Sequence, residues 1–350
     1  MNKTRLIALI ALAMVASIAT YSLFNADTFS TEFIFKTNVR SSKNLTEEAK
    51  IKAAYLQWKK NHSKLFAQVE DSKRYSIFKK SYRIVESHNK KNLSWTLGLN
   101  QFATQTDEEF SALNLGLVIP PTQHLSSLPL FNGTLKGCPP TLDWRSAGIV
   151  TGVKNQGNCG SCWAFSTTGA LEGLYGLVAK KLVAFSEQQL VDCSGPYGNH
   201  GCGGGYMNSA FTYVRDRGIQ SASSYPYRAV QGGCGYNPGV VVFRLRGFQN
   251  IPQNNPGALG AAICQQPVAV GVQADQPAFR YYNGGVITGG CGTQMNHGII
   301  AMGYGNGFWI VKNSWGTGWG EGGYARIASG TQNGGAGVCG INIGASVPVA

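Results

Sequence analysis

Cysteine is absent from the first 137 residues, and all nine cysteines of the 350-residue chain follow from Cys138 onward. Acidic residues are also few, because 17 Asp and Glu accompany 30 Lys and Arg and leave a formal net charge of +13. The basic residues are spread through the chain without a long block, which favours a solvated surface over a nucleic-acid-binding tail. The 46 glycines form no repeat, so they indicate many turns rather than a fibrous or low-complexity chain.

Long hydrophobic runs are also missing, apart from one that extends from Leu6 to Ala19 behind the basic residues Lys3 and Arg5. This run is short for a membrane span and ends in small residues. It therefore predicts a secretory signal peptide over residues 1–19, with an uncleaved anchor as the alternative. After signal removal we expect no membrane span, and we expect the chain in the secretory pathway, either in a lysosome-like compartment or secreted.

The secretory route gives meaning to the cysteines, because disulfides form in oxidising compartments. An odd number of cysteines leaves at least one thiol unpaired. After the expected signal peptide, N-glycosylation sequons occur at Asn44, Asn61, Asn92 and Asn132, and none lies after Gly137.

Motifs for a metal, a phosphate or a dinucleotide are not convincing. Residues 201–205 are rich in glycine but lack the strand-then-helix context of a nucleotide loop. Residues 138–350 contain only two histidines, and one of them, His200, lies in a short polar stretch that predicts a surface loop. We therefore expect no cofactor and no metal.

The informative stretch is residues 156–165, Gln-Gly-Asn-Cys-Gly-Ser-Cys-Trp-Ala-Phe, which leads into an apolar pattern of helical spacing. Ser161 is placed to cap this helix, and Cys162 falls in its first turn. Unpaired N–H groups and the helix dipole at that position favour a thiolate, which is the nucleophilic form of cysteine.

The segment Cys159-Gly-Ser-Cys-Trp163 resembles the active-site signature of papain-like cysteine proteases, in which His and Asn partners follow ~130–150 residues downstream. His297 and Asn313 stand at this spacing in Met-Asn-His-Gly and Lys-Asn-Ser-Trp-Gly contexts. The resemblance is strongest to the cathepsin L type and runs from about Leu45 to the C-terminus. It implies an α+β, papain-like two-lobe fold, in which a helical lobe and an antiparallel β-barrel lobe follow a helical prodomain.

The resemblance also implies the catalytic roles. Cys162 is the nucleophile, His297 is its proton partner, and Asn313 orients the imidazole. Gln156 joins the backbone N–H of Cys162 as a donor to the oxyanion. Trp315 shields the His–Asn hydrogen bond from water.

A substrate-binding cleft is carried over in the same way. Its residues line the pocket for the second residue before the scissile bond or pair with extended substrate: Gly204, Gly205, Tyr206, Met207, Gly271, Met295, Asn296, Gly298, Trp315 and Gly344. This pocket is apolar and without an acid, which favours Leu or Phe over Arg. The loop from Cys193 to Cys202 is too short to occlude the cleft, so the resemblance implies an endopeptidase.

Three disulfides are implied by the family: Cys159–Cys202, Cys193–Cys234 and Cys291–Cys339. Cys138, Cys162 and Cys264 remain. Cys264 lies in a short apolar stretch that predicts a helix, where a buried free thiol is common. Cys138 falls near the start of the mature region, where an exposed thiol would not persist in oxidising surroundings. A fourth bond, Cys138–Cys264, between the two cleft walls is the alternative hypothesis.

An inhibitory propeptide is expected over residues 20–137, with a helical core at about 45–112 and a linker at 113–137; the peptidase domain follows at 138–350. A helix should begin near Thr46, and a second should cover roughly Glu70 to Asn89. The second helix carries a stripe that is similar to the family's propeptide signature: Glu70, Arg74, Phe78, Ser81, Val85 and Asn89.

Two further features belong to the propeptide. Thr106 and Glu109 form a capping box that opens one more short helix. Residues 98–102 resemble a second propeptide motif. The usual aspartate of that motif is replaced by Thr104, which argues against the pH-sensing role that such an acid would have. A separate helical binding module is the alternative for residues 45–112.

The C-terminal half predicts antiparallel strands from short β-branched or aromatic runs: Val240–Phe243, Val268–Val272, Ile299–Met302, Phe308–Val311 and Tyr324–Ile327. Expected partners are protein and peptide substrates and the chain's own propeptide, on a monomer. Two alternatives to a protease stay open: a thiol–disulfide oxidoreductase that uses Cys159 and Cys162, and a non-catalytic binding homologue.

Overall fold

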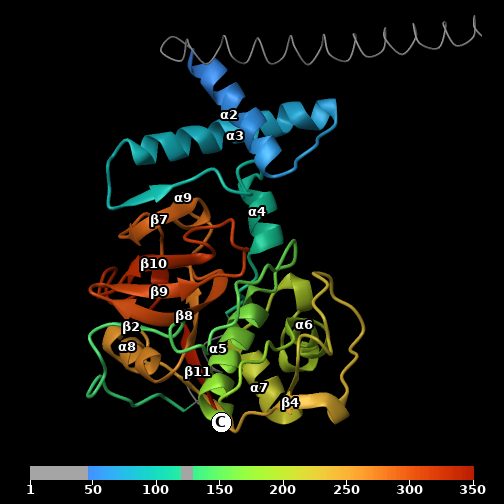
Figure 1. Ribbon diagram of the computed structural model, residues 1–350, viewed down its shortest axis with the longest axis vertical. Coiled ribbons are helices and arrows are strands. Elements are labelled where there is room, and N and C mark those ends of the chain that lie inside the picture. Colours follow the sequence, from blue (N-terminus) through green and yellow to red (C-terminus); the bar gives the residue numbers. More distant parts are fainter. Residues whose placement is uncertain (1–45, 120–128) are drawn as a thin grey trace, which may run out of the picture. The chain divides into compact units, whose positions relative to one another are not determined.

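A computed structural model describes residues 46–119 and 129–350 (Figure 1). The expected signal peptide and the sequon at Asn44 lie outside the described residues. The chain divides into two compact units, Met1–Lys64 and Leu65–Ala350. Within the described ranges, no helix combines the length and apolar character that a membrane crossing requires.

The described part of the first unit is one helix, α2 (Glu47–Asn61). It begins as expected, because the Thr46 side chain accepts a hydrogen bond from the Ala49 N–H at 3.3 Å. Acidic residues occupy its first turn and lysines its last turn, which suits the helix dipole. The rings of Tyr55 and Trp58 stack on one side of it, with centroids 6.3 Å apart.

The second unit starts with α3 (Gln68–Asn89), which has the residue stripe predicted from the sequence. Phe78, Ser81 and Val85 are buried along that stripe. The Ser81 hydroxyl lies 2.9 Å from the hydroxyl of Tyr281 in the peptidase region. The Asn89 amide exchanges two 2.9 Å hydrogen bonds with the backbone of Leu97. The stripe therefore packs both on the following propeptide strand and on the peptidase region.

Two further propeptide elements follow. The strand β1 (Trp95–Leu97) pairs antiparallel with β7 (Tyr282–Ile287), so the propeptide adds a strand to the sheet of the peptidase. The helix α4 (Asp107–Asn114) opens with the predicted capping box of Thr106 and Glu109. Arg74 on α3 reaches across to Glu109 and to the carbonyl of Thr104, which ties the two helices together.

The helical lobe is built around α5 (Cys162–Ala179), which is buried along most of its length. It packs with α6 (Glu187–Cys193) and α7 (Met207–Arg217). The buried apolar residues of these helices form one core with Phe185 and Ile219. A two-stranded sheet of β3 (Ile219–Gln220) and β4 (Val241–Phe243) completes this lobe.

The β lobe is one large sheet of order β1-β7-β10-β9-β8-β6-β11-β5, with β2 paired to β8 (Figure 1). Its peptidase strands are β2 (Leu142–Asp143), β5 (Gly247–Asn250), β6 (Val268–Val272), β7, β8 (His297–Gly305), β9 (Phe308–Lys312), β10 (Tyr324–Ala328) and β11 (Ala345–Val349). Helices α8 (Pro256–Gln265) and α9 (Pro277–Arg280) flank the sheet. The two lobes meet where α5 packs on β8, and the Ser166 hydroxyl donates to the Ile299 carbonyl at 2.6 Å.

Several strand predictions hold, and some details differ. The runs at 268–272, 308–311 and 324–327 are strands, and the run at 299–302 is the centre of the longer β8. The run at 240–243 gives β4, but β4 pairs with β3 in the helical lobe rather than joining the barrel. One pair, β10 with β7, is parallel rather than antiparallel.

All nine cysteines lie in the described part of the chain, and eight of them form disulfides: Cys138–Cys264, Cys159–Cys202, Cys193–Cys234 and Cys291–Cys339. The Cα atoms of Cys138 and Cys264 lie 5.9 Å apart. This bond does not join the two cleft walls, because β2 pairs with β8 and the Trp144 indole donates to the Ile263 carbonyl at 2.7 Å. It fixes the N-terminal arm of the peptidase to α8 inside the β lobe.

The ion pair between Arg74 and Glu109 should make the stability of the zymogen depend on pH. Hydrogen bonding to Arg74 lowers the pKa of Glu109 from 4.5 to about 2. A carboxyl with a lowered folded-state pKa stabilises fully above its unfolded pKa, and this contribution disappears as pH falls towards the folded value. Because Glu109 is partly exposed, we expect Glu109→Gln to lower the free energy of unfolding by about 1 kcal/mol at pH 6.

The measurement is thermal unfolding of the full chain on a Cys162→Ser background, for parent and Glu109→Gln, at several pH values from 6 to about 2. The difference between the two should shrink steadily below pH about 4.5. The exposed Glu47→Gln on α2 serves as the matched control. A difference that stays constant down to pH about 2 would contradict the assignment.

Candidate active site

Cys162 is the first residue of α5 and is fully buried. It is the one free cysteine of the chain. Ser161 occupies the cap position as expected, but its side chain makes no capping bond. Its hydroxyl instead lies 2.6 Å from that of Tyr227. The predicted start of the helix is therefore confirmed, but the predicted side-chain cap is wrong.

Burial dominates the electrostatics of the Cys162 thiol in the zymogen. It raises the thiol pKa to about 12, although backbone N–H groups of Gly298, Trp163 and Gly116 act in the opposite direction. A charge without water around it is unfavourable even at a helix N-terminus. Cys162 is therefore a neutral thiol while the propeptide is in place, rather than the thiolate expected from its position alone.

His297 begins β8 and is fully buried beside Asn313, which follows β9. Its Nε2 lies 2.8 Å from the Asn313 Oδ1. The amide oxygen only accepts, so Nε2 carries the proton and, in the neutral ring, Nδ1 has a free lone pair. Among the described residues, Nδ1 has no hydrogen-bond partner. Burial lowers the pKa of His297 to about 4, which keeps the ring neutral in the zymogen.

Trp315 covers this pair, as the resemblance implies. Its ring centroid lies 4.4 Å from that of His297, and the Trp315 side chain is buried. The Asn313 Oδ1 also accepts the Ser314 N–H at 2.7 Å. The His297 Nε2–H and the Ser314 N–H therefore share the Asn313 Oδ1, while the Asn313 Nδ2 is buried without a hydrogen-bond partner among the described residues.

Gln156 is held at the other end of the site by a network of hydrogen bonds. Its Oε1 accepts from the Ser314 hydroxyl at 2.7 Å. Its Nε2 donates to the Cys159 carbonyl at 2.9 Å and to the propeptide carbonyl of Asn114 at 3.0 Å. A carbonyl oxygen of the propeptide therefore lies on the amide that the resemblance assigns to the oxyanion.

Propeptide residues 116–118 run through the cleft as an extended strand. Gly116 accepts from the Gly205 N–H at 2.9 Å, and Val118 donates to the Gly205 carbonyl at 2.9 Å. This pairing is parallel. The backbone also donates from Gly116 and Leu117 to the Asn296 carbonyl.

Gly116 has no room for a side chain. A Cβ atom placed on it would lie 2.0 Å from the carbonyl oxygen of Gly160. The expected substrate residue Gly204 is also close to the propeptide, because a Cβ atom placed on it would lie 2.8 Å from the Gly116 carbonyl oxygen. The main chain of the propeptide thus passes directly over the start of α5.

Leu117 enters the predicted specificity pocket. Its Cδ2 lies 2.8 Å from the place where a Cβ of Gly271 would stand, and the Met295 sulfur lies at the same distance from that point. A Cβ on Gly344 would also meet the Met295 side chain at 2.8 Å. Tyr206 and Met207 belong to the same buried cluster as Leu117. Of the predicted residues, Asn296 turns its side chain away, to the Ala274 N–H, and only its carbonyl faces the propeptide.

A buried group of charges behind the site was not predicted. Lys154 contacts both Glu172 and Glu187, which also accept from Thr151 and Thr168. The neighbouring Lys312, one residue before Asn313, donates to the Thr151 carbonyl at 2.6 Å, and burial lowers its pKa to about 8. The sequence does show that Glu172 is the one charged residue of this helix, but its charged partners are distant in the chain.

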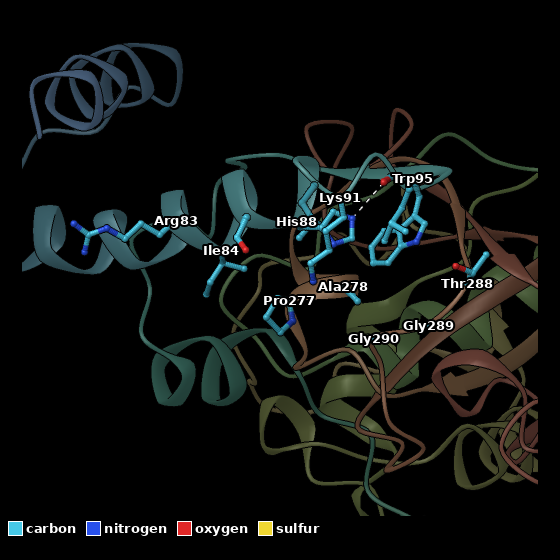
Figure 2. A pocket seen from close by; sticks show the side chains of 13 residues that line it. Arg83, Ile84, His88, Lys91, Trp95, Pro277, Ala278, Thr288, Gly289 and Gly290 are labelled. Atoms are coloured by element: carbon cyan, nitrogen blue, oxygen red, sulfur yellow. Dashed lines mark hydrogen bonds between the residues drawn. The ribbon is translucent and has the colours of Figure 1, made fainter. Parts of the chain in front are cut away.

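The structure also contains a cavity of about 620 Å³ between α3, β1 and residues 288–290 (Figure 2). His88 donates to the Trp95 carbonyl at 3.2 Å on one side of it. None of the proposed catalytic residues lines this cavity, so it is separate from the cleft. In the described residues, no group of three metal-ligating side chains is found.

Comparisons with known proteins agree with this geometry. Residues 138–349 match the papain family cysteine protease model, and residues 55–110 match the cathepsin propeptide inhibitor domain. A cathepsin L-like proteinase of Fasciola hepatica is 41% identical over 84% of this chain and 92% of its own length. A senescence-specific cysteine protease of Oryza sativa is 37% identical over 89% of this chain and 94% of its own.

Solved proforms give the same result. The proform of a ragweed pollen cysteine protease has a TM-score of 0.77 and 38% identity, covering 87% of this chain and 94% of that one. A digestive procathepsin L of Tenebrio molitor has a TM-score of 0.78 and 38% identity, covering 86% and 100%. The chain therefore belongs to the papain family of cysteine proteases and is made as a zymogen with a cathepsin-type inhibitory propeptide.

Proposed function

We propose that the chain is an endopeptidase whose reaction uses Cys162 and His297, assisted by Asn313 and Gln156. The observation that carries this proposal is the course of the propeptide main chain, which places a carbonyl on Gln156, Gly116 on the Cys162 thiol, and Leu117 in an apolar pocket. These are the places that an acyl-transfer site must offer to the backbone and side chain of a substrate.

The reaction starts when the propeptide leaves and water and substrate enter. Rehydration removes the desolvation that keeps both groups neutral, so the thiol proton moves to the Nδ1 of His297 and a thiolate–imidazolium pair forms. The thiolate attacks the scissile carbonyl carbon. The negative oxygen of the tetrahedral intermediate accepts hydrogen bonds from the Gln156 Nε2 and the Cys162 backbone N–H.

His297 then returns its proton to the leaving amine, and the C–N bond breaks to give a thioester on Cys162. Water attacks this thioester while Nδ1 takes its proton, and the acid product leaves as the thiol is restored. Asn313 holds the ring for both transfers through Nε2, and it does so without adding a negative charge. The neutral amide keeps the imidazolium acidic enough to give up its proton.

The propeptide is not cut although it occupies the cleft. Its strand pairs in parallel with Gly205, and we infer that substrate pairs there in the opposite direction. The carbonyl of Asn114 then reaches Gln156 from a chain that runs the wrong way for attack by the thiol. The propeptide thus acts as an intramolecular inhibitor.

Secretion fits the four disulfides and the relatives. One relative is named a KDEL-tailed cysteine endopeptidase, from Arabidopsis thaliana. We therefore place the enzyme in the secretory pathway, in a lysosome-like compartment or outside the cell, as a monomer that acts on proteins and peptides. The mature domain starts near Cys138.

The alternative of a thiol–disulfide oxidoreductase loses its main support. Its Cys-x-x-Cys chemistry needs a bond between Cys159 and Cys162, but Cys159 is paired with Cys202. A non-catalytic homologue is also disfavoured, because the thiol, the imidazole, the orienting amide and the Gln156 amide are all in place.

Alkylation should identify the nucleophile. Cys162 is the one cysteine outside the disulfides, so iodoacetamide at pH 5 should label this residue alone in activated enzyme. The zymogen, whose thiol is buried with a pKa of about 12, should react at least about a hundredfold more slowly. Peptide mapping by mass spectrometry measures both rates.

Two variants complete this test. Cys162→Ser should abolish peptide hydrolysis and labelling while thermal unfolding stays cooperative, and His297→Ala should remove the fast labelling of the activated form. Turnover by Cys162→Ser within tenfold of the parent would refute the assignment.

The propeptide expressed alone should inhibit the mature domain. A peptide of residues 46–119 contains the cleft-spanning segment, so it should bind more tightly than residues 46–112, and both should weaken as pH drops. Gly116→Ala should weaken inhibition at least about tenfold, because a Cβ there meets the Gly160 backbone. The exposed Ser111→Ala is the matched control. The measurement is the inhibition constant at pH 7 and pH 4.5. Equal constants for the Gly116→Ala peptide and the parent peptide would count against this placement of the propeptide in the cleft.

The pocket that holds Leu117 should set substrate preference. Fluorogenic peptides with Leu second before the scissile bond should have a kcat/KM at least about a hundredfold higher than those with Arg, because the pocket offers an arginine no carboxylate. Gly271→Ala narrows the pocket. It should therefore reduce the cleavage of substrates with Phe second before the scissile bond more than that of substrates with Val at this position. Equal rates for Leu and Arg substrates would disprove this pocket assignment.

A further inference from the structure

Arg280 is a peptidase residue whose side-chain hydrogen bonds all go to the propeptide. It is the last residue of α9 and is only 2% exposed in the zymogen. Its Nη1 donates to the Asp107 carboxylate at 2.8 Å. Its Nη2 donates to the backbone carbonyls of Phe102 at 3.0 Å and Gln105 at 2.5 Å.

The guanidinium of Arg280 contacts one aromatic ring of the propeptide and one of the peptidase. Its carbon lies 4.5 Å from the ring centroid of the propeptide residue Phe110 and 4.9 Å from that of Tyr281 on the peptidase side. The Arg280 Nε is buried and has no hydrogen-bond partner among the described residues. When the propeptide leaves, Tyr281 remains as a stacking platform and every hydrogen-bond acceptor of Arg280 in the described structure is gone.

The position of Arg280 in the cleft follows from the course of the propeptide. Gly116 lies at Cys162, and Leu117 continues to Gly205 on the side that receives the residues before the scissile bond. Residues 101–110 lie on the opposite side, where Gln101 donates to the Trp315 carbonyl at 2.8 Å and Phe102 packs on the Trp315 ring with centroids 5.1 Å apart. Arg280 adjoins this region through Phe279, whose ring lies 5.7 Å from that of Trp315.

We propose that Arg280 forms a carboxylate-binding subsite on the leaving-group side of the cleft, which Asp107 fills in the zymogen and an acidic substrate side chain fills in the mature enzyme. The proposal rests on the proposed peptidase function. Asp107 shows that the site admits a carboxylate, and its side chain is 93% exposed, so the approach is open to solvent. In the zymogen the guanidinium gives Asp107 one hydrogen bond, while its Nη2 donates to two propeptide carbonyls. Once those acceptors leave, Nη1 and Nη2 are both available to one carboxylate, which a planar guanidinium binds better than water or a lone carbonyl.

The subsite gives the enzyme a preference that its apolar pocket cannot supply. A charge-assisted hydrogen bond is about twice as strong as a neutral one. An arginine held by a ring also loses less side-chain entropy on binding than a free one. We therefore expect discrimination between an acid and its neutral isostere of about tenfold, decreasing with salt because the site faces water.

The test uses activated full-chain enzyme and fluorogenic peptides that share Leu second before the scissile bond. Asp or Asn is placed at each of the first four positions after that bond, one at a time. At one of these positions the parent should show a kcat/KM about tenfold higher for Asp than for Asn. Raising NaCl from 0.05 to 0.5 M should reduce this ratio.

Variants of Arg280 test whether this residue causes the preference for Asp over Asn. Arg280→Gln should bring the Asp/Asn ratio close to one, and Arg280→Lys should leave an intermediate ratio, since an ammonium keeps the charge but not the planar fork. The control is Arg326→Gln on β10, which removes a cation that is paired with Glu321 and should leave the ratio of the parent. A parent ratio near one at all four positions, or a ratio that survives Arg280→Gln, overturns the proposal.

A second readout covers the case in which Arg280→Gln does not yield folded enzyme. Propeptide of residues 46–119 with Asp107→Asn should inhibit parent enzyme about tenfold less well than the unchanged peptide, and the loss should shrink at high salt. An unchanged inhibition constant also overturns the proposal. Cleavage of the neutral Asn peptides by the parent separates this question from the proposed function, because that cleavage requires the peptidase reaction but not the subsite.

Discussion

The exclusion of water from the space above Cys162 is the constraint on which the zymogen depends. The propeptide main chain passes so close to the start of α5 that only glycine fits at position 116. In that dry environment both the thiol and the imidazole are more stable without charge. The same contact therefore occupies the cleft and keeps the proton on the Cys162 sulfur, so under the proposed mechanism inhibition acts on geometry and on electrostatics together.

The propeptide is held in this position by several weak contacts spread over its length. The strand β1 extends the sheet of the peptidase at β7, and the stripe on α3 docks through small polar contacts such as Ser81 with Tyr281. The aromatic residues Phe102 and Phe110 close over Trp315. Because each contact is modest, loss of a few of them is sufficient to loosen the whole segment, which suits a part that must be removed.

Much of this architecture could be predicted from local pattern and resemblance. Helix starts at Thr46 and Thr106 follow from capping chemistry that acts within a few residues. The glycine-rich β7 and the proline-containing β11 were not predicted, since their strand structure comes from pairing in the sheet and not from propensity. β4 was assigned to the wrong sheet for the same reason. The buried group around Lys154 and Lys312 was missed because its charges come from distant parts of the chain.

The disulfide between Cys138 and Cys264 determines which backbone cuts can release the inhibitor. A break before Cys138 leaves the preceding segment bound by non-covalent contacts alone, so it can diffuse away. A break after Cys138 leaves that segment covalently linked to α8 through the sulfur bridge, and its local concentration over the cleft stays high. The bridge therefore makes the result of maturation depend on the position of the cut. A shift of one or two residues decides between an enzyme that is free of its inhibitor and one that stays covalently linked to it.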